Sequence, residues 1–196
     1  MTILLTAFDP FGGEAVNASQ EALEALPDSV AGMMIEKRIL PTVFRASGEL
    51  AIRTAEDIRP DAILALGQAG GRRALTPERI AVNLMDARIP DNDGFQPTDQ
   101  PVVPGGPAAY FSTLPVKEMV RAITEAGVPA QVSNSAGTFV CNSLMYALLH
   151  WAAARSPGTR CGFLHLPLLK DLEKASAVRG LTAALSALAA EWAGEH

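Results

Sequence analysis

TILLTAFDPFGG, residues 2–13, is the stretch of sequence that decides the fold. Residues 2–8 are a short and nearly continuous apolar run, which Asp9, Pro10 and two glycines bring to an end. Such a run, closed by turn-forming residues, is typical of a strand that is buried on both faces and followed by a turn. Strands of this kind belong to sheets that helices cover on both sides.

A helix and another strand follow, and the pattern then repeats. Asn17 is a suitable N-cap, and apolar residues mark one face of residues 17–26, so this segment is expected to be a helix. The same signals predict a strand at 33–40, a helix at 44–58 and a strand at 62–66. Strand, helix and strand with short connections favour right-handed crossovers and a mostly parallel sheet. The expected fold class is α/β, a three-layer sandwich with helices on both faces of the central sheet.

The second half of the chain continues the alternation. Helices are predicted at 115–126, at 140–155 and near the C-terminus, and the second of these is apolar nearly all round and therefore central. Strands are predicted at 130–134 and 161–166. No repeat or linker interrupts the sequence, so residues 1–196 are expected to form a single domain.

One segment, Pro90–Pro107, breaks this rhythm. It holds five prolines, three glycines and three aspartates, with too few apolar residues for a helix or strand. Connections longer than about 12–15 residues inside a compact domain are usually functional or disordered. The segment is a candidate lid or subunit contact, and a solvated surface loop is the alternative.

Composition limits the classes of partner. Of the 196 residues, 48% are hydrophobic and 19% charged, as in a compact globular domain. A net charge of −5 without Lys/Arg clusters makes neither nucleic acid nor a membrane surface an expected partner. No secretory signal and no membrane span are evident. A cytoplasmic location with Cys141 and Cys161 reduced is therefore expected, although two cysteines can also pair as a disulfide.

The motif SNSAGTFVCN, residues 133–142, places Cys141 near the start of the buried helix, after a turn of small residues. The positive end of a helix dipole favours thiolate over thiol, and free N–H groups there can stabilise an oxyanion. Cys141 is therefore a candidate nucleophile. A small buried core residue is the alternative.

A cysteine nucleophile needs a base, and the chain has only three histidines. His150 lies nine residues beyond Cys141 in the same helix, so it is about 180° around and about 13 Å along the axis. His196 is the last residue. His165, near the end of the last strand, is the remaining candidate, with a core histidine as the alternative.

An imidazole base is usually oriented by a carboxylate on its other nitrogen. Glu78 is the best candidate for that role, and a surface salt-bridge partner is the alternative. Cys161 is expected to be structural, because it lies four residues before His165, about 13 Å away along a strand. The residues lack the spacing of a metal site, so no metal is predicted. GQAGGR, residues 67–72, follows a strand like a phosphate loop but lacks the ending of a P-loop.

Six motifs together resemble the type I pyroglutamyl peptidases, or pyrrolidone-carboxylate peptidases, from residue 1 to the last helix. They are LTAFDPFGG (5–13), GQAGGR (67–72), ERIAVN (78–83), DARIPDN (86–92), SNSAGTFVCN (133–142) and HLP (165–167). One departure is Ala7, where the family is expected to have glycine.

The resemblance implies the nucleophile, base and orienting carboxylate at Cys141, His165 and Glu78, and an arginine near the oxyanion at Arg88. It implies a pyroglutamyl pocket made of Phe8, Phe11, Thr42, Gln68, Ile89, Phe139 and Val140. It also implies a phosphorylase/hydrolase-like α/β sandwich, no cofactor, and a homo-oligomer, by resemblance a tetramer.

The function expected is that of a cysteine peptidase, which removes N-terminal pyroglutamate from peptides through a thioester acyl-enzyme. Pyroglutamate is a flat, uncharged lactam, so it requires aromatic walls and a few polar partners rather than a charged anchor. Two alternatives remain open at this point. One is a nucleoside phosphorylase-like transferase that uses the glycine-rich turns for phosphate, and the other is a non-catalytic binder of pyroglutamyl peptides.

Overall fold

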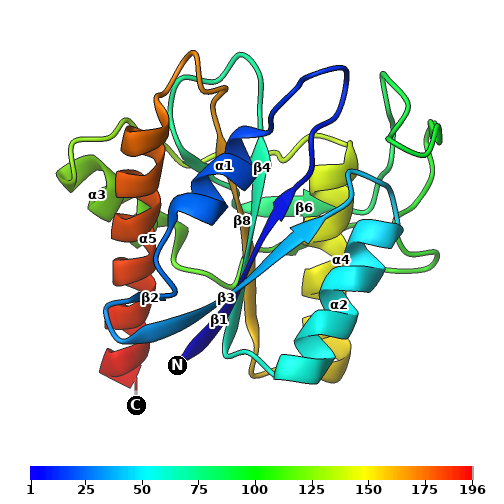
Figure 1. The fold of residues 1–196 in the computed structure, drawn as a ribbon. Helices are drawn as coiled ribbons and strands as arrows, with labels where there is room; N and C mark the ends of the chain where they lie inside the picture. The colour runs from blue at the N-terminus through cyan, green and yellow to red at the C-terminus, as the bar shows by residue number, and fades with distance from the viewer. Residues whose placement is uncertain (196) are drawn as a thin grey trace.

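The computed structural model of the protein describes residues 1–195, which form strands and helices interspersed along the chain (Figure 1). The strands are β1 (Thr2–Phe8), β2 (Ser29–Val30), β3 (Met33–Leu40), β4 (Ala62–Gln68), β5 (Thr76–Pro77), β6 (Ile80–Val82), β7 (Ala109–Phe111) and β8 (Arg160–Leu166). The helices are α1 (Ala18–Ala25), α2 (Ala46–Ile58), α3 (Val116–Glu125), α4 (Val140–Arg155) and α5 (Lys174–Glu195).

The central sheet has the strand order β2-β3-β1-β4-β8-β5. The four inner strands β3, β1, β4 and β8 are parallel, and the two-residue edge strands β2 and β5 are antiparallel to their neighbours. β6 and β7 form a separate antiparallel ribbon. Because the inner strands are parallel, their carboxyl ends lie at one edge of the sheet, where ligand sites of open α/β sheets form.

Helices cover both faces of the sheet, and Figure 1 shows α1, α3 and α5 on one side and α2 and α4 on the other. Successive side chains of a strand point to opposite faces. Ile3 and Leu5 of β1 accordingly pack with α1, α3 and α5, whereas Leu4 packs with α2 and α4. The expected three-layer α/β sandwich with a mostly parallel sheet is confirmed.

The element predictions agree closely with the structure, with one clear exception. Asn17 caps α1, since its side chain accepts from the N–H of Ser19 at 3.0 Å. The strand predicted at residues 130–134 is wrong, because that segment makes only isolated bridges, from Ala130 and Ser133. Its neighbour β5 ends at Pro77, which has no N–H to extend a ladder.

The Pro90–Pro107 segment contains no helix or strand, as expected. It is nevertheless anchored to the body of the protein. The carboxylate of Asp91, which is 6% exposed, accepts from the backbone N–H groups of Phe44, Asp93 and Phe95. Asn92 donates to Asp9 in the connection after β1. The segment is therefore fixed next to the carboxyl end of β1; its role as a lid or subunit contact stays a prediction.

Across the part of the chain that the structure describes, every helix falls short of the length or the apolarity that crossing a bilayer requires.

Candidate active site

A cleft of about 910 Å³ opens outside the carboxyl ends of β4 and β8. Several segments that are far apart in the sequence contribute its walls. They are the turn after β1, the loop after β4, residues 86–89, the turn before α4, and the end of β8. The lining residues are Phe11, Gly12, Glu14, Gln68, Ala69, Gly70, Arg72, Asp86, Arg88, Ile89, Ser135, Ala136, Gly137, Thr138, Phe139, Cys141, His165 and Leu168.

Cys141 lies in the first turn of α4, where the helix meets the cleft. The chain reaches this point through Gly137, whose φ of +77° is in the left-handed region that glycine adopts freely. The N-cap, Phe139, makes no side-chain capping bond. The first N–H groups of α4 are thus left to other acceptors, as an oxyanion site requires.

The Cys141 thiol is not held ionised in the free protein. Burial raises its pKa to about 12 and the charge of Glu78 adds to the rise, while the charge of Arg72 and the N–H of Cys141 itself oppose it. Burial and the positive end of the α4 dipole therefore act on the thiol in opposite directions. The sulfur needs a neighbouring base to remove its proton.

His165 supplies an imidazole at the cleft floor. Its Nδ1 lies 2.7 Å from Oε1 of Glu78, and its ring packs 4.7 Å, centroid to centroid, from Phe163. Burial lowers the pKa of His165, the hydrogen bond and charge of Glu78 oppose that change, and the charge of Arg72 adds to it. Because a carboxylate only accepts, Nδ1 carries the proton, and Nε2 keeps a free lone pair.

Gly67 shows how the sulfur and the imidazole come together. In the β4–β8 pairing Gly67 lies directly opposite His165. Paired residues on neighbouring strands point to the same face and stand about 4.8 Å apart. A Cβ on Gly67 would lie 2.9 Å from Sγ of Cys141. The sulfur therefore occupies the space that a side chain at position 67 would fill, beside the imidazole, and only glycine leaves this space open.

Glu78 is fully buried and directly follows β5. Its N–H donates to the carbonyl of Phe163 at 2.8 Å, which fixes it beside β8. The alternative of a surface salt-bridge partner is wrong. The structure thus brings Cys141, His165 and Glu78, which are distant in sequence, to one site.

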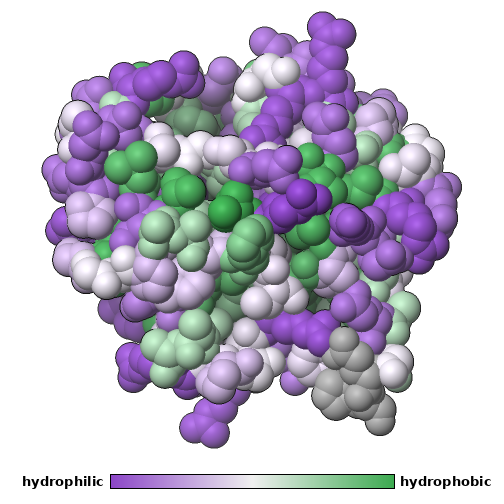
Figure 2. Space-filling model, turned by 180° about the vertical axis from the view of Figure 1, so that it is seen from behind, coloured by the Kyte–Doolittle hydropathy of each residue, from purple (hydrophilic) through white to green (hydrophobic). Residues whose placement is uncertain are grey.

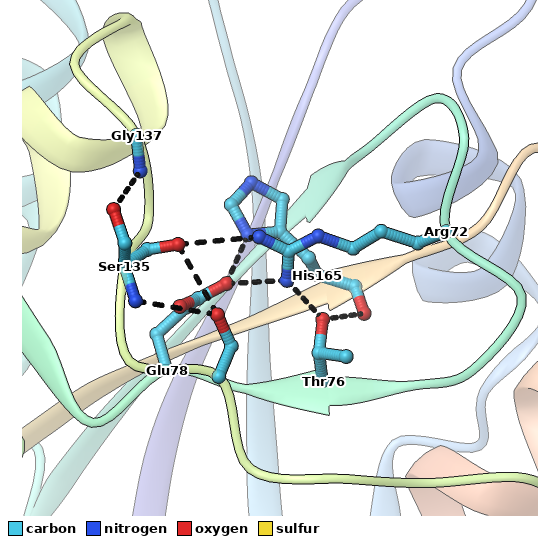
Figure 3. A network of polar contacts seen from close by, with 7 residues as sticks. Arg72, Thr76, Glu78, Ser135, Gly137 and His165 are labelled. Atoms are coloured by element: carbon cyan, nitrogen blue, oxygen red, sulfur yellow. Dashed lines mark hydrogen bonds and ion pairs between the residues drawn. The ribbon is translucent and has the colours of Figure 1, made fainter.

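Arg72 is a residue of this site that the sequence did not single out. Its Nη1 donates to Oε1 of Glu78 at 2.6 Å and to the hydroxyl of Thr76, and its Nη2 donates to the carbonyl of Ser135 at 3.3 Å (Figure 3). A signal existed in the sequence: Arg72 closes the GQAGGR motif, six residues before Glu78.

Arg88 is exposed and lines the same cleft as Cys141. Within residues 1–195 its guanidinium has no hydrogen bond or ion pair. It is therefore available to a bound molecule.

The pocket residues implied by the resemblance divide into two groups. Phe11, Gln68, Ile89 and Phe139 line the cleft, and the rings of Phe11 and Phe139 stand 5.9 Å apart. Phe44, which the sequence did not place here, backs Phe139 edge-on at 5.3 Å.

The other three implied residues do not line the cleft but lie buried beneath it. Phe8 packs 6.5 Å from Phe163, Thr42 bonds to Asp9, and Val140 is fully buried. Strand and helix periodicity turns Phe8 and Val140 to the core, whereas Thr42 lies in the loop before α2 and is held there by its bonds to Asp9. They support the wall from behind.

The remaining histidines and cysteine have other surroundings. His150 bonds to the hydroxyl of Tyr110 at 2.9 Å and stacks on Tyr146, away from the cleft. His196 lies outside the described residues. Cys161 is fully buried, and burial raises its pKa to about 12. Both cysteines are free thiols. In residues 1–195 no cluster of three or more His, Cys, Asp or Glu side chains could hold a metal.

Comparison with known proteins agrees with this geometry. A family model described as pyroglutamyl peptidase matches residues 1–190. The pyrrolidone-carboxylate peptidase of Levilactobacillus brevis is 50% identical over 198 residues, which cover 96% of this chain and 97% of the relative. The pyrrolidone-carboxylate peptidase of Streptococcus pyogenes serotype M4 is 53% identical over 171 residues, which cover 87% of this chain and 80% of the relative.

Solved structures give the same result. Pyroglutamyl peptidase I of Bacillus amyloliquefaciens has a TM-score of 0.93 at 42% identity and covers 96% of this chain and 97% of its own. A mutant pyrrolidone carboxyl peptidase of Pyrococcus furiosus has a TM-score of 0.94 at 37% identity and covers 98% of this chain and 100% of its own. The match extends from the first strand to the last helix, and the chain belongs to the pyroglutamyl peptidase family.

Proposed function

We propose that the protein removes N-terminal pyroglutamate from peptides, with Cys141 as nucleophile, His165 as base and Glu78 as the carboxylate that orients the base. The observation that carries the proposal is the hydrogen bond between His165 and the buried Glu78, in the cleft that also holds Cys141. Membership of the pyroglutamyl peptidase family gives the reaction, and the positions of these three residues support the roles proposed for them.

The cleft suits a pyroglutamyl ring. Phe11 and Phe139 provide aromatic faces for a flat lactam, and Ile89 adds an apolar side chain. The carbonyl oxygen of Gln68 accepts from the N–H of Ala18 at 2.7 Å, which fixes the orientation of this amide at the cleft wall. A ring that lacks the lactam carbonyl would leave polar groups of the pocket unpaired, and this favours pyroglutamate over proline.

The first half of the reaction forms a thioester. Nε2 of His165 accepts the proton of the Cys141 thiol as the sulfur attacks the pyroglutamyl carbonyl carbon. The electron pair of the C=O bond moves to oxygen, and the first N–H groups of α4 stabilise this oxyanion together with Arg88. The C–N bond then breaks, and the imidazolium gives its proton to the leaving amine.

The second half releases pyroglutamate. Nε2 of His165 takes a proton from water while the oxygen of that water attacks the thioester carbonyl. The C–S bond breaks, and the proton returns to the sulfur. Glu78 holds the imidazole in the same orientation throughout and stabilises its charged form, which exists only transiently.

Neither alternative function is supported by the comparisons. A transferase would need a phosphate site, whereas the GQAGGR loop turns its arginine toward Glu78. A binder without activity would not need the set of Cys141, His165 and Glu78.

The proposal includes a cytoplasmic location, because a thiol nucleophile needs a reducing compartment. It also includes assembly into a homo-oligomer, a tetramer by resemblance. Figure 2 shows hydrophobic residues gathered in a band across one face of the molecule, between hydrophilic margins. Large apolar side chains are exposed on the surface, with Phe111 at 67% and Met34 at 53%. Light scattering after gel filtration should give a mass of about four chains, and a mass of one chain would rule the assembly out.

The function is tested by comparing pyroglutamyl, prolyl and glutamyl amides of a fluorogenic amine. We expect release only from the pyroglutamyl amide, and loss of that release in Cys141→Ala with unchanged thermal unfolding. Cys161→Ala is the matched control and should retain most activity. Substantial turnover by Cys141→Ala would refute covalent catalysis at this residue, and an inactive Cys161→Ala would shift the assignment to the other cysteine.

A further inference from the structure

Arg72 joins three segments of the site. It belongs to the loop after β4, and one of its nitrogens binds Thr76 and Glu78 at β5. Its other nitrogen binds the carbonyl of Ser135 in the turn that leads to Cys141. Figure 3 shows the guanidinium among these groups, with the His165 ring and the guanidinium both directed at the Glu78 carboxylate.

Glu78 depends on Arg72 for its charge compensation. Its side chain is fully buried, and Oε1 accepts from both Arg72 and His165. Its second oxygen, Oε2, is buried without a hydrogen-bond partner in residues 1–195. Burying a carboxylate is costly unless it is paired with an opposite charge and hydrogen-bonded. Since burial keeps His165 neutral, Arg72 is the positive charge that matches Glu78.

We propose that Arg72 is a positioning residue for the reaction. Its guanidinium donates to Oε1 of Glu78 and supplies the opposite charge, so that Glu78 stays in place to accept from Nδ1 of His165 and Nε2 is left free for the Cys141 thiol. Its bond to Ser135 fixes the base relative to the turn that delivers the nucleophile. This inference rests on the proposed function and extends it to a residue outside the set of nucleophile, base and orienting carboxylate.

The charges around His165 predict the direction in which the pH dependence of activity should move when Arg72 is replaced. His165 faces Glu78 from β5, Arg72 from the loop after β4 and Cys141 from α4, and the cleft walls add Glu14, Asp86 and Arg88. Burial has the largest effect on both groups, because it lowers the pKa of His165 and raises that of Cys141. In addition, Glu78 raises and Arg72 lowers the pKa of both residues. Loss of Arg72 should therefore move the acid limb of activity to higher pH.

The experiment compares Arg72→Gln and Arg72→Lys. The control is Arg73→Gln, because Arg73 is the next residue in the chain and its side chain is exposed. Hydrolysis of the pyroglutamyl amide is followed across pH. We expect Arg72→Gln to lower kcat roughly 10- to 100-fold, part of the about 10²- to 10⁴-fold that general base catalysis contributes. KM should stay within about threefold of the wild-type value, because the lost group acts through His165.

The acid limb of kcat/KM should move to higher pH in Arg72→Gln and stay near its wild-type position in Arg72→Lys, which keeps the charge. Arg73→Gln should match the wild type. A rise in KM with kcat unchanged would overturn the inference, since Arg72 would then bind substrate directly. A fall in kcat without movement of the acid limb would also overturn it.

A second measurement needs no variant. The ¹⁵N spectrum of the wild-type histidines should show His165 neutral at pH 7 with its proton on Nδ1, and a cationic ring would refute the inference even if Arg72→Gln failed to fold. If the wild type does not hydrolyse the pyroglutamyl amide, the proposed function fails. If it does, and Arg72→Gln behaves as the wild type, only the role of Arg72 fails.

Discussion

At the scale of single residues, the site depends on one absent side chain as much as on those present. Gly67 has no Cβ, and the sulfur of Cys141 and the ring of Phe163 fill the space that a Cβ would need. The choice of glycine in GQAGGR is thus explained by the nucleophile and not by a phosphate. Adding one methyl group at position 67 tests whether this glycine makes room for the sulfur or serves a phosphate loop.

Gly67→Ala should reduce activity, because the new Cβ would lie 2.7 Å from Phe163 and 2.9 Å from the sulfur. Both groups must then move, at a typical cost of about 1–3 kcal/mol in stability. We expect kcat for the pyroglutamyl amide to fall by at least about tenfold, since small displacements of reacting atoms are costly.

Gly158→Ala is the matched control for this change, because a Cβ there would meet no atom within 4 Å. Its thermal unfolding and kcat should equal those of the wild type. If Gly67→Ala were as active as this control, the sulfur could not occupy the position described.

At the scale of elements, the start of α4 is held in place by its own side chains. Asn142, which is fully buried, accepts from the N–H of Val82 at 2.9 Å and donates to the carbonyls of Val82 and Leu84, both at 2.9 Å. The amide thereby acts as an extra strand partner for β6. The helix that carries the nucleophile is bound directly to the segment that follows Glu78.

Asn142→Ala should therefore destabilise the protein, because the N–H of Val82 and the carbonyl of Leu84 lose the partner that Asn142 provides, while the carbonyl of Val82 keeps the N–H of Leu84. The expected loss is about 1–3 kcal/mol in the free energy of unfolding. Urea denaturation measures it. Asn134→Ala, at an exposed asparagine of the same motif, serves as control and should change stability by less than about 0.5 kcal/mol. Equal stability of the two variants would contradict the role of Asn142 as a clamp.

At the scale of the whole molecule, the buried His165 and Cys161 and the partly buried Cys141 should determine how stability depends on pH. Burial lowers the pKa of His165 below 6.5, so the unfolded chain binds more protons as the pH falls through 6.5. Burial raises the pKa of Cys141 and Cys161 from 9.0 to about 12, so the folded chain binds more protons between these values. The free energy of unfolding should therefore fall as the pH drops through 6.5 and as it rises above 9.0.

The melting temperature should be highest between about pH 6.5 and 9 and fall on either side. Scanning calorimetry across pH measures this, under reducing conditions. Cys161→Ala removes one of the two thiols and should make the alkaline decline shallower. A melting temperature that stayed constant up to pH 11 would show that the thiols ionise freely in the folded protein.

The elements that the sequence predicted well are those with strong local signals. The strand at Met33–Leu40 and the helix at Val140–Arg155 have the predicted bounds, because apolar runs and turn residues are properties of neighbouring positions. The two-residue strands β2 and β5 and the β6–β7 ribbon were missed, because such short pieces form only where a partner is present. The strand predicted at 130–134 makes only isolated bridges, because Pro77 in the neighbouring segment has no N–H to extend a ladder.

Sequence by itself determined the α/β alternation, the position of Cys141 at a helix start and the choice of His165 by elimination, since these follow from spacing along the chain. Only the tertiary structure decided that Glu78 is buried against His165, that Arg72 matches its charge, and that burial keeps the thiol protonated. Burial and charge pairing depend on segments up to 87 residues apart that meet only after folding. Local pattern carries no information on the distance between such segments, and that distance controls the chemistry of the site.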